Sequence, residues 1–188
     1  MNILSNQKTC IIVVGPQGSG KGTQCTKLVE KYNLLYFEMG DVLRKAKNSN
    51  PEIAQIMSQG QLLSDDVVQS FVSVFAQSAT TNSFLMDGFP RNIAQATWLF
   101  NFLGLLSFRV VVVNLVVSDR QVLIDRMLAR SRSDDTIDVI HRRLDTYNHV
   151  TLPLITYFQS LGCSVHTIDA SSDLETIFQE VDNVFLNT

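Results

Sequence analysis

The stretch Thr9–Val14, TCIIVV, leads directly into Gly15–Thr23, GPQGSGKGT. The first stretch is apolar and mostly β-branched, which predicts a buried strand. The second contains the spacing G-x-x-x-x-G-K, which is the Walker A pattern where it joins a strand to a helix. Its glycines let backbone N–H groups converge on phosphate oxygens, and Lys21 adds a compact positive charge. The stretch therefore predicts a phosphate-binding loop near the start of an α/β fold.

The rest of the chain alternates short apolar stretches with longer amphipathic ones. Strands are predicted at Thr9–Val14, Leu34–Phe37, Ser83–Met86, Arg109–Val117 and Cys163–Ile168, and helices at Gly20–Lys31, Asp41–Ala46, Ser64–Ala79, Asn92–Leu103, Asp119–Ala129, Asp134–Gln159 and Ser171–Leu186. This alternation is typical of βαβ units, which build a parallel sheet with helices on both faces. Pro153 should kink or split the longest helix. We predict one three-layer α/β domain over residues 1–188 with a five-stranded parallel sheet.

Composition argues against several classes of protein. The 188 residues are 45% hydrophobic and carry a formal net charge of -3, and a chain of this length buries enough surface to fold without a metal or a disulfide. Its three cysteines are far apart and form no C-x-x-C pair, which fits a reducing cytoplasm. No apolar stretch is long enough to span a membrane. The acidic balance argues against a nucleic-acid partner.

Basic residues are nevertheless concentrated in one part of the chain. Seven of the nine arginines lie between Arg109 and Arg143, and the planar fork of arginine suits bidentate contacts with phosphate. Asp87 follows the apolar run Phe84–Met86, at a strand end where a carboxylate can hold Mg²⁺ through water. Together these features predict a site for a small, highly charged anion with magnesium, for which Thr23 is a further candidate ligand.

Several motifs resemble those of the adenylate kinases, within the nucleoside monophosphate kinase family. They are Lys21–Gln24 (KGTQ), Gly40–Arg44 (GDVLR), Gly60–Asp65 (GQLLSD), Asp87–Arg91 (DGFPR), Asp125-Arg126, Arg132–Asp135 (RSDD) and Arg143–Tyr147 (RLDTY). They follow the order of the family from Thr9 to about Ala170, and DGFPR together with the KGTQ loop is highly specific. The resemblance implies a P-loop kinase of the short-lid type.

The resemblance also implies an activity and a set of site residues. The activity is transfer of the γ-phosphoryl group of Mg-ATP to AMP, which gives two ADP. By position, the catalytic residues would be Lys21, Arg91, Arg130, Arg132 and Arg143, and the ATP-binding residues Gly15, Gly18, Ser19, Gly20, Lys21, Gly22, Thr23, Arg126 and Arg130. The acceptor-binding residues would be Met39, Gly40, Arg44, Gln61, Leu62, Leu63, Gly88, Arg91, Gln95, Arg132 and Arg143. Residues 39–79 would form the acceptor-binding segment and 130–134 a vestigial lid. Magnesium without zinc, nucleotides as the small-molecule partners, and a monomer are expected.

Some charged residues have a simpler interpretation. Arg109, Arg120 and Arg142 are interpreted as solvated surface residues. The pair Asp134-Asp135 fits two interpretations equally well. The two acids could favour the macrodipole in the first turn of a helix capped by Ser133, or, as the resemblance implies, they could hold lid arginines.

Two positions leave the acceptor base open. Met39 stands where adenylate kinases carry a threonine beside the acceptor base, whereas Gln95 matches their adenine-reading glutamine. Because an amide can pair with a donor and an acceptor of adenine together, Gln95 favours AMP. The alternatives are a UMP/CMP or deoxynucleoside monophosphate kinase of the same fold, and a nucleotide-binding module without catalysis.

Overall fold

Parallel strands form the centre of the computed structural model, which describes residues 8–78, 83–130, 132 and 135–186. Within these residues the sheet has five strands in the order β2-β3-β1-β4-β5. They are β1 (Thr9–Val14), β2 (Leu35–Glu38), β3 (Ser83–Asp87), β4 (Arg109–Val116) and β5 (Ser164–Asp169). All residues of β1 are buried, because this strand lies between β3 and β4 and both faces of the sheet are covered. The predicted fold class is confirmed.

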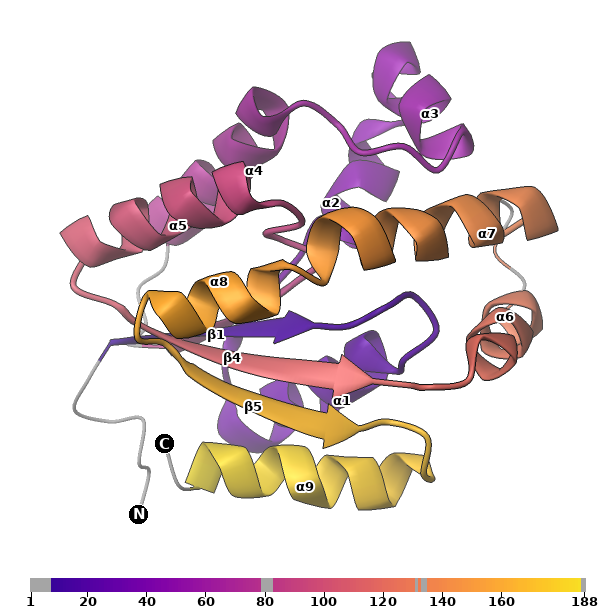
Figure 1. The fold of residues 1–188 in the computed structure, drawn as a ribbon. Coiled ribbons are helices and arrows are strands. Elements are labelled where there is room, and N and C mark those ends of the chain that lie inside the picture. The colour runs from indigo at the N-terminus through magenta and orange to yellow at the C-terminus, as the bar shows by residue number, and fades with distance from the viewer. Residues whose placement is uncertain (1–7, 79–82, 131, 133–134, 187–188) are drawn as a thin grey trace.

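Helices cover both faces of the sheet, which gives three layers (Figure 1). The helices α1 (Lys21–Tyr32) and α9 (Leu174–Leu186) lie on one face, and α5 (Ile93–Leu105) and α8 (Leu154–Ser160) on the other. Ile11 and Val13 of β1 belong to the apolar cluster on the first face, and Cys10 and Ile12 to the cluster on the second. This alternation follows from the strand geometry, in which successive side chains point to opposite faces.

A helical arm connects β2 to β3 above the sheet (Figure 1). It consists of α2 (Met39–Ala46), α3 (Pro51–Ser58) and α4 (Asp65–Ser78). Helix α3 is absent from the sequence prediction. The Asn50 side chain caps this helix by accepting hydrogen bonds from two backbone N–H groups, and Pro51 occupies the first turn, where its missing N–H does no harm. Helix α2 begins at Met39 rather than Asp41, with Glu38 in the cap position.

The long helix predicted at Asp134–Gln159 is divided in the structure. It consists of α7 (Ile137–Thr146), a π-helical turn (Tyr147–Thr151) and α8, which begins directly after Pro153. The predicted break at Pro153 is therefore present. Helix α6 (Arg120–Ala129) lies beside α7 at the end of the sheet where the strands terminate (Figure 1). Ser131, Ser133 and Asp134, which belong to the predicted lid and helix start, lie outside the described residues.

Candidate active site

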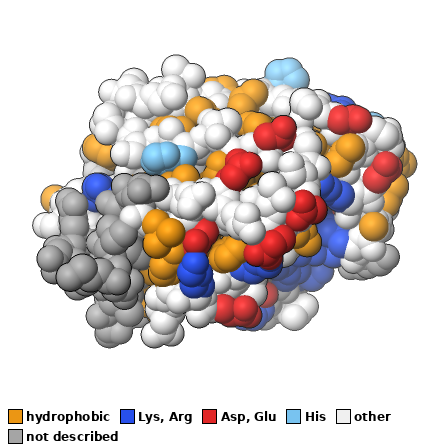
Figure 2. All heavy atoms as spheres, turned by 90° about the horizontal axis from the view of Figure 1, so that it is seen from below, with side chains coloured by type: hydrophobic (Ala, Val, Ile, Leu, Met, Phe, Trp, Pro, Cys, Tyr) orange, Lys and Arg blue, Asp and Glu red, His pale blue; other side chains and the backbone are white. Residues whose placement is uncertain are grey.

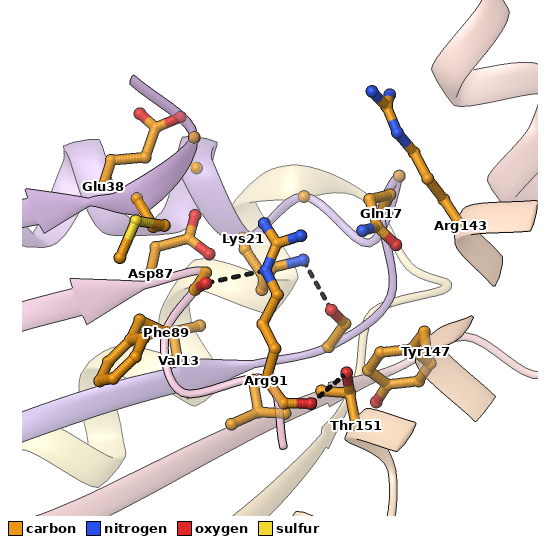
Figure 3. A pocket seen from close by; sticks show the side chains of 18 of the residues that line it. Val13, Gln17, Lys21, Glu38, Asp87, Phe89, Arg91, Arg143, Tyr147 and Thr151 are labelled. Carbon is orange, nitrogen blue, oxygen red and sulfur yellow. Dashed lines mark hydrogen bonds between the residues drawn. The ribbon is translucent and has the colours of Figure 1, made fainter. Parts of the chain in front are cut away.

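A cavity of about 1000 Å³ lies at the C-terminal ends of β1 and β3. Open α/β sheets bind their ligands at this edge. The walls of the cavity come from the loop after β1, the helical arm, the turn after β3, and the helices α6 and α7. Figure 3 shows charged side chains converging on it from several of these elements.

The loop between β1 and α1 has the backbone shape that its glycines allow. Gly18 has a φ of +87°, and a Cβ atom there would lie 2.7 Å from the carbonyl oxygen of Leu123, so no larger residue fits. The Lys21 ammonium donates hydrogen bonds to the carbonyl oxygens of Gly15 and Pro16 at 2.7 and 2.8 Å. Burial lowers the pKa of Lys21, because its charge is taken out of water. An anion in this loop would therefore stabilise the charged form of Lys21.

Two carboxylates lie at neighbouring strand ends in the cavity wall. Glu38 ends β2 and Asp87 ends β3, and the two residues are in register. Burial raises the pKa of Asp87, while the nearby Lys21 charge opposes this shift. The Asp87 carboxylate lies in the cavity wall with the loop after β1, and its oxygen atoms are hard ligands of the kind that Mg²⁺ prefers. Glu38 also lines the cavity (Figure 3), although no sequence motif marks it.

Two arginines bring positive charge from the side of the arm. Arg44 Nη2 pairs with Glu38 Oε1 at 2.7 Å. Arg91 Nε donates to the carbonyl oxygen of Gly88 at 2.8 Å, and burial lowers the pKa of Arg91. The Thr151 hydroxyl in the π-helical turn donates to the carbonyl oxygen of Arg91 at 2.9 Å. This turn therefore helps to hold Arg91 in the cavity wall (Figure 3).

On the opposite side, one buried carboxylate holds two arginines. Arg130 donates to Asp135 through Nε at 2.6 Å and Nη2 at 3.1 Å, and Arg143 Nη1 donates to it at 2.7 Å. The Asp135 side chain is only 1% exposed. Because α7 begins at Ile137, Asp135 precedes the helix, and its role as a holder of arginines is the one that the structure supports. Arg132 lines the same wall, and its pKa is lowered by burial and by the charge of Arg130.

Comparison with known proteins agrees with this geometry. A sequence model of the adenylate kinase family matches residues 13–163. The chain belongs to the adenylate kinase family. It is 38% identical to the adenylate kinase of Synechococcus sp. (strain WH7803) over an alignment of 174 residues. This alignment covers 90% of this chain and 94% of that protein. The adenylate kinase of Prochlorococcus marinus (strain MIT 9211) is 39% identical over 174 residues, which are 90% of this chain and 93% of that protein. The adenylate kinase of Synechococcus sp. (strain CC9902) is 34% identical over 181 residues, which are 94% of this chain and 98% of that protein. The family resemblance predicted from the motifs is confirmed.

In this adenylate kinase family member, the residues assigned by position come together in one place. All of the predicted ATP-binding, acceptor-binding, catalytic and magnesium residues line the cavity except Ser19. Ser19 is fully buried, and its hydroxyl oxygen has no hydrogen-bond partner among the described residues. Arg126 donates to the carbonyl oxygen of Ala170 at 2.9 Å, which joins α6 to the segment after β5 at the end of the cavity predicted for ATP.

Met39 and Gln95, the two residues that leave the identity of the acceptor base undecided, differ in their surroundings. Met39 is 2% exposed and belongs to the apolar cluster that runs under the arm, as well as lining the cavity. Gln95 is equally buried, but its amide is hydrogen-bonded on both sides. Its Oε1 accepts from the Arg91 N–H at 2.7 Å, and its Nε2 donates to Asp65 Oδ1 at 2.8 Å. Gln95 is therefore the residue of this pair that places a fixed polar group in the cavity wall.

Several contacts at or near the cavity have no motif to mark them. Arg142 is exposed, as expected for a surface residue, yet its Nη1 donates to the Gln59 carbonyl oxygen of the arm. Next to this contact, Gly60 has a φ of +67°, and a Cβ there would lie 3.2 Å from Val139 of α7. The glycine thus allows the arm to approach α7 closely. Tyr147 also lines the cavity from the π-helical turn.

The described residues contain no group of three His, Cys, Asp or Glu that is arranged to hold a metal ion. Within the same part of the chain, none of the helices combines the length and the hydrophobicity needed to cross a bilayer. Figure 2 shows one outer face, on which acidic and basic side chains lie next to one another. This mixture contrasts with the cavity wall, where basic side chains predominate.

Proposed function

We propose that this protein transfers the γ-phosphoryl group of Mg-ATP to AMP, giving two ADP. The observation that carries the proposal is the convergence of six basic residues on one cavity: Lys21, Arg44, Arg91, Arg130, Arg132 and Arg143. A protein that only bound ATP would have no use for the second group of cations on the arm side. The relatives named adenylate kinase support the same activity.

The chemistry explains why the site is rich in arginine and needs no general base. The acceptor phosphate has a second pKa of about 6, so at neutral pH it is already a nucleophile. The protein must hold two polyanions in line and neutralise the charge of the transition state. Lys21 and the start of α1 would bind the terminal phosphates of ATP, and Arg44 and Arg91 the acceptor phosphate. The three remaining arginines would surround the group in transfer, with Asp135 keeping two of them in position.

Magnesium would be held near the end of β3. Asp87 is a buried carboxylate beside Lys21, and we assign it to Mg²⁺ through water, with Thr23 as a further ligand. When bound, the ion would neutralise charge on the phosphate oxygens of ATP. Residues 39–79 would form the arm that binds the acceptor, and the short segment 130–134 would be a vestigial lid. The proposal includes a monomer that works in the cytoplasm.

A panel of acceptors tests the proposal. The purified protein is given Mg-ATP with AMP, dAMP, UMP or CMP, and kcat/KM is measured for each. We expect AMP to exceed the pyrimidine nucleotides by at least about 10-fold, the discrimination that one bidentate base contact supplies. Faster turnover of UMP or CMP would show a pyrimidine nucleotide kinase. Tight ATP binding without product from any acceptor would show a binding module.

A matched pair of variants tests the assignment of the cations. Arg91→Ala removes a charge from the cavity, whereas Arg120→Ala removes an arginine that pairs with Asp145 outside the cavity. We expect Arg91→Ala to lower kcat by about 10²–10³, as loss of one transition-state charge contact does. Arg120→Ala should keep full activity. A loss below about tenfold for Arg91→Ala would contradict its role.

A further inference from the structure

The side-chain amide of Gln95 is held in one orientation. Oε1 accepts a hydrogen bond from the backbone N–H of Arg91 at 2.7 Å, and Nε2 donates one to Asp65 Oδ1 at 2.8 Å. If the amide turned over, its oxygen would face the Asp65 carboxylate and its NH₂ group would face the Arg91 N–H. Both contacts would then be repulsive, because a carboxylate is only an acceptor and a backbone N–H only a donor.

Asp65 is itself held in place by the start of α5. The Asn92 side chain caps this helix, with Oδ1 accepting from the Gln95 N–H at 2.8 Å. The Nδ2 group of Asn92 donates to the same Asp65 Oδ1 at 2.9 Å. Asp65 belongs to the first turn of α4 in the arm. One carboxylate oxygen from the arm therefore accepts hydrogen bonds from two side-chain amides in the segment after the DGFPR motif.

The amide of Gln95 keeps part of its hydrogen-bonding capacity for a ligand. A glutamine amide offers two acceptor sites on oxygen and two donors on nitrogen. One of each is used by Arg91 and Asp65, so one acceptor and one donor remain. Gln95 lines the cavity on the acceptor side, and a donor next to an acceptor matches two adjacent positions on the edge of a purine base.

The order of these two groups decides which purine they fit. Adenine carries a donor amino group at position 6 and an acceptor nitrogen at position 1. Hypoxanthine has the same ring system and the reverse order, with an acceptor carbonyl at position 6 and a donor N–H at position 1. An amide in fixed orientation can match only one of these orders, whereas a freely turning amide can match both.

We propose that Asp65 is a positioning residue for acceptor specificity, which fixes the orientation of the Gln95 amide and thereby favours AMP over IMP. This inference rests on the proposed function, in which AMP is the acceptor. Asp65 does not line the cavity, so it acts through Gln95 and not by touching the base. It joins the arm to the acceptor pocket, because the oxygen that orients Gln95 comes from α4.

Three variants test the inference. Asp65→Ala removes one of the two contacts that orient the Gln95 amide and leaves only the Arg91 N–H, which an amide nitrogen or a water can also face. Asp65→Asn keeps a side-chain oxygen at the same length, which can still accept from both amides. Asp66→Ala is the matched control, because Asp66 lies in the same first turn of α4 and is exposed. For each protein, kcat and KM are measured with AMP and with IMP, together with KM for ATP and the thermal unfolding temperature.

We expect Asp65→Ala to lower the ratio of kcat/KM for AMP to that for IMP by about 10-fold, within the range of one bidentate base contact. The change should lie mainly in KM for the acceptor, with KM for ATP unchanged. Asp65→Asn should retain most of the preference for AMP over IMP, and Asp66→Ala should leave this preference unchanged. If Asp65→Ala does not fold, the same comparison is made with Asp65→Ser, whose hydroxyl is too short to reach Gln95 but suits the start of a helix.

Two results would overturn the inference. One is an equal loss of activity with AMP and IMP in Asp65→Ala, since a purely structural residue would leave their ratio unchanged. The other is a ratio in Asp65→Asn as low as that in Asp65→Ala. Failure of the proposed function looks different, because the unmodified protein would then prefer an acceptor other than AMP, whatever the variants do.

Discussion

Replacing Asp135 by alanine should damage both stability and catalysis, because this carboxylate holds two arginines of the cavity. The substitution breaks three charge-assisted hydrogen bonds, to Arg130 at 2.6 and 3.1 Å and to Arg143 at 2.7 Å. The Asp135 side chain is 1% exposed, while the side chains of Arg130 and Arg143 are 29% and 14% exposed. Removing one partner of a buried ion pair lowers the free energy of unfolding by about 3–5 kcal/mol. Because the two arginines are partly exposed, we expect the lower end of this range, about 3 kcal/mol.

Two measurements follow from this magnitude. For a chain of this size the melting temperature should fall by about 6–12 °C, at about 2–4 °C per kcal/mol. Because both arginines lose the group that orients them, kcat should fall by about 100-fold. The control is Asp138→Ala, which removes an exposed acid from the first turn of α7. A kcat within about threefold of the unmodified protein, measured at a temperature where Asp135→Ala is folded, would refute the role of Asp135 in catalysis.

Three further substitutions probe the loop after β1, the end of β2, and the contact between α7 and the arm. Lys21→Met should lower kcat by about 10²–10³, because it removes the charge assigned to the terminal phosphates of ATP; a loss below about tenfold would contradict this role. Glu38→Gln should reduce KM for the acceptor by about 2- to 5-fold, because the carboxylate paired with Arg44 no longer competes with the acceptor phosphate; a higher KM would show that Glu38 positions Arg44 instead. Arg142→Gln should raise KM for the acceptor by about fivefold while leaving KM for ATP unchanged, since it removes the hydrogen bond from α7 to Gln59 of the arm; an unchanged acceptor KM would exclude this contact from closure of the arm.

The fold was predictable because its signals are local. The strand Thr9–Val14 and the loop after it have a pattern that physical chemistry restricts to few structures, and the β-branched runs mark the remaining strands. Helix α3 escaped prediction because it is short and begins at Asn50-Pro51, a pair that is equally common in turns. The start of α7 at Ile137 was also misplaced, since Thr136 rather than Ser133 occupies the cap position.

The contacts inside the site were less accessible from sequence because they join distant residues. Asp65 and Gln95 are separated by 30 positions, and Gln59 and Arg142 by 83. Neither pair has a spacing that periodicity or a motif would reveal. The place of Glu38 in the cavity wall was not predicted for a different reason. Its side chain lines the cavity only because β2 ends in register with Asp87. The motifs thus indicate which residues line the cavity, but not which residues hold those side chains in position.

Transfer of phosphate between two nucleotides is the central claim, and isotope labelling tests it most directly. The protein is incubated with Mg-ATP labelled in the γ-phosphate and with unlabelled AMP, and the products are separated. If the cationic cavity performs the proposed reaction, the label appears in the β-phosphate of newly formed ADP, with two ADP produced for each AMP consumed. Label that stays in ATP, or that is released as inorganic phosphate while AMP is unchanged, would contradict the account.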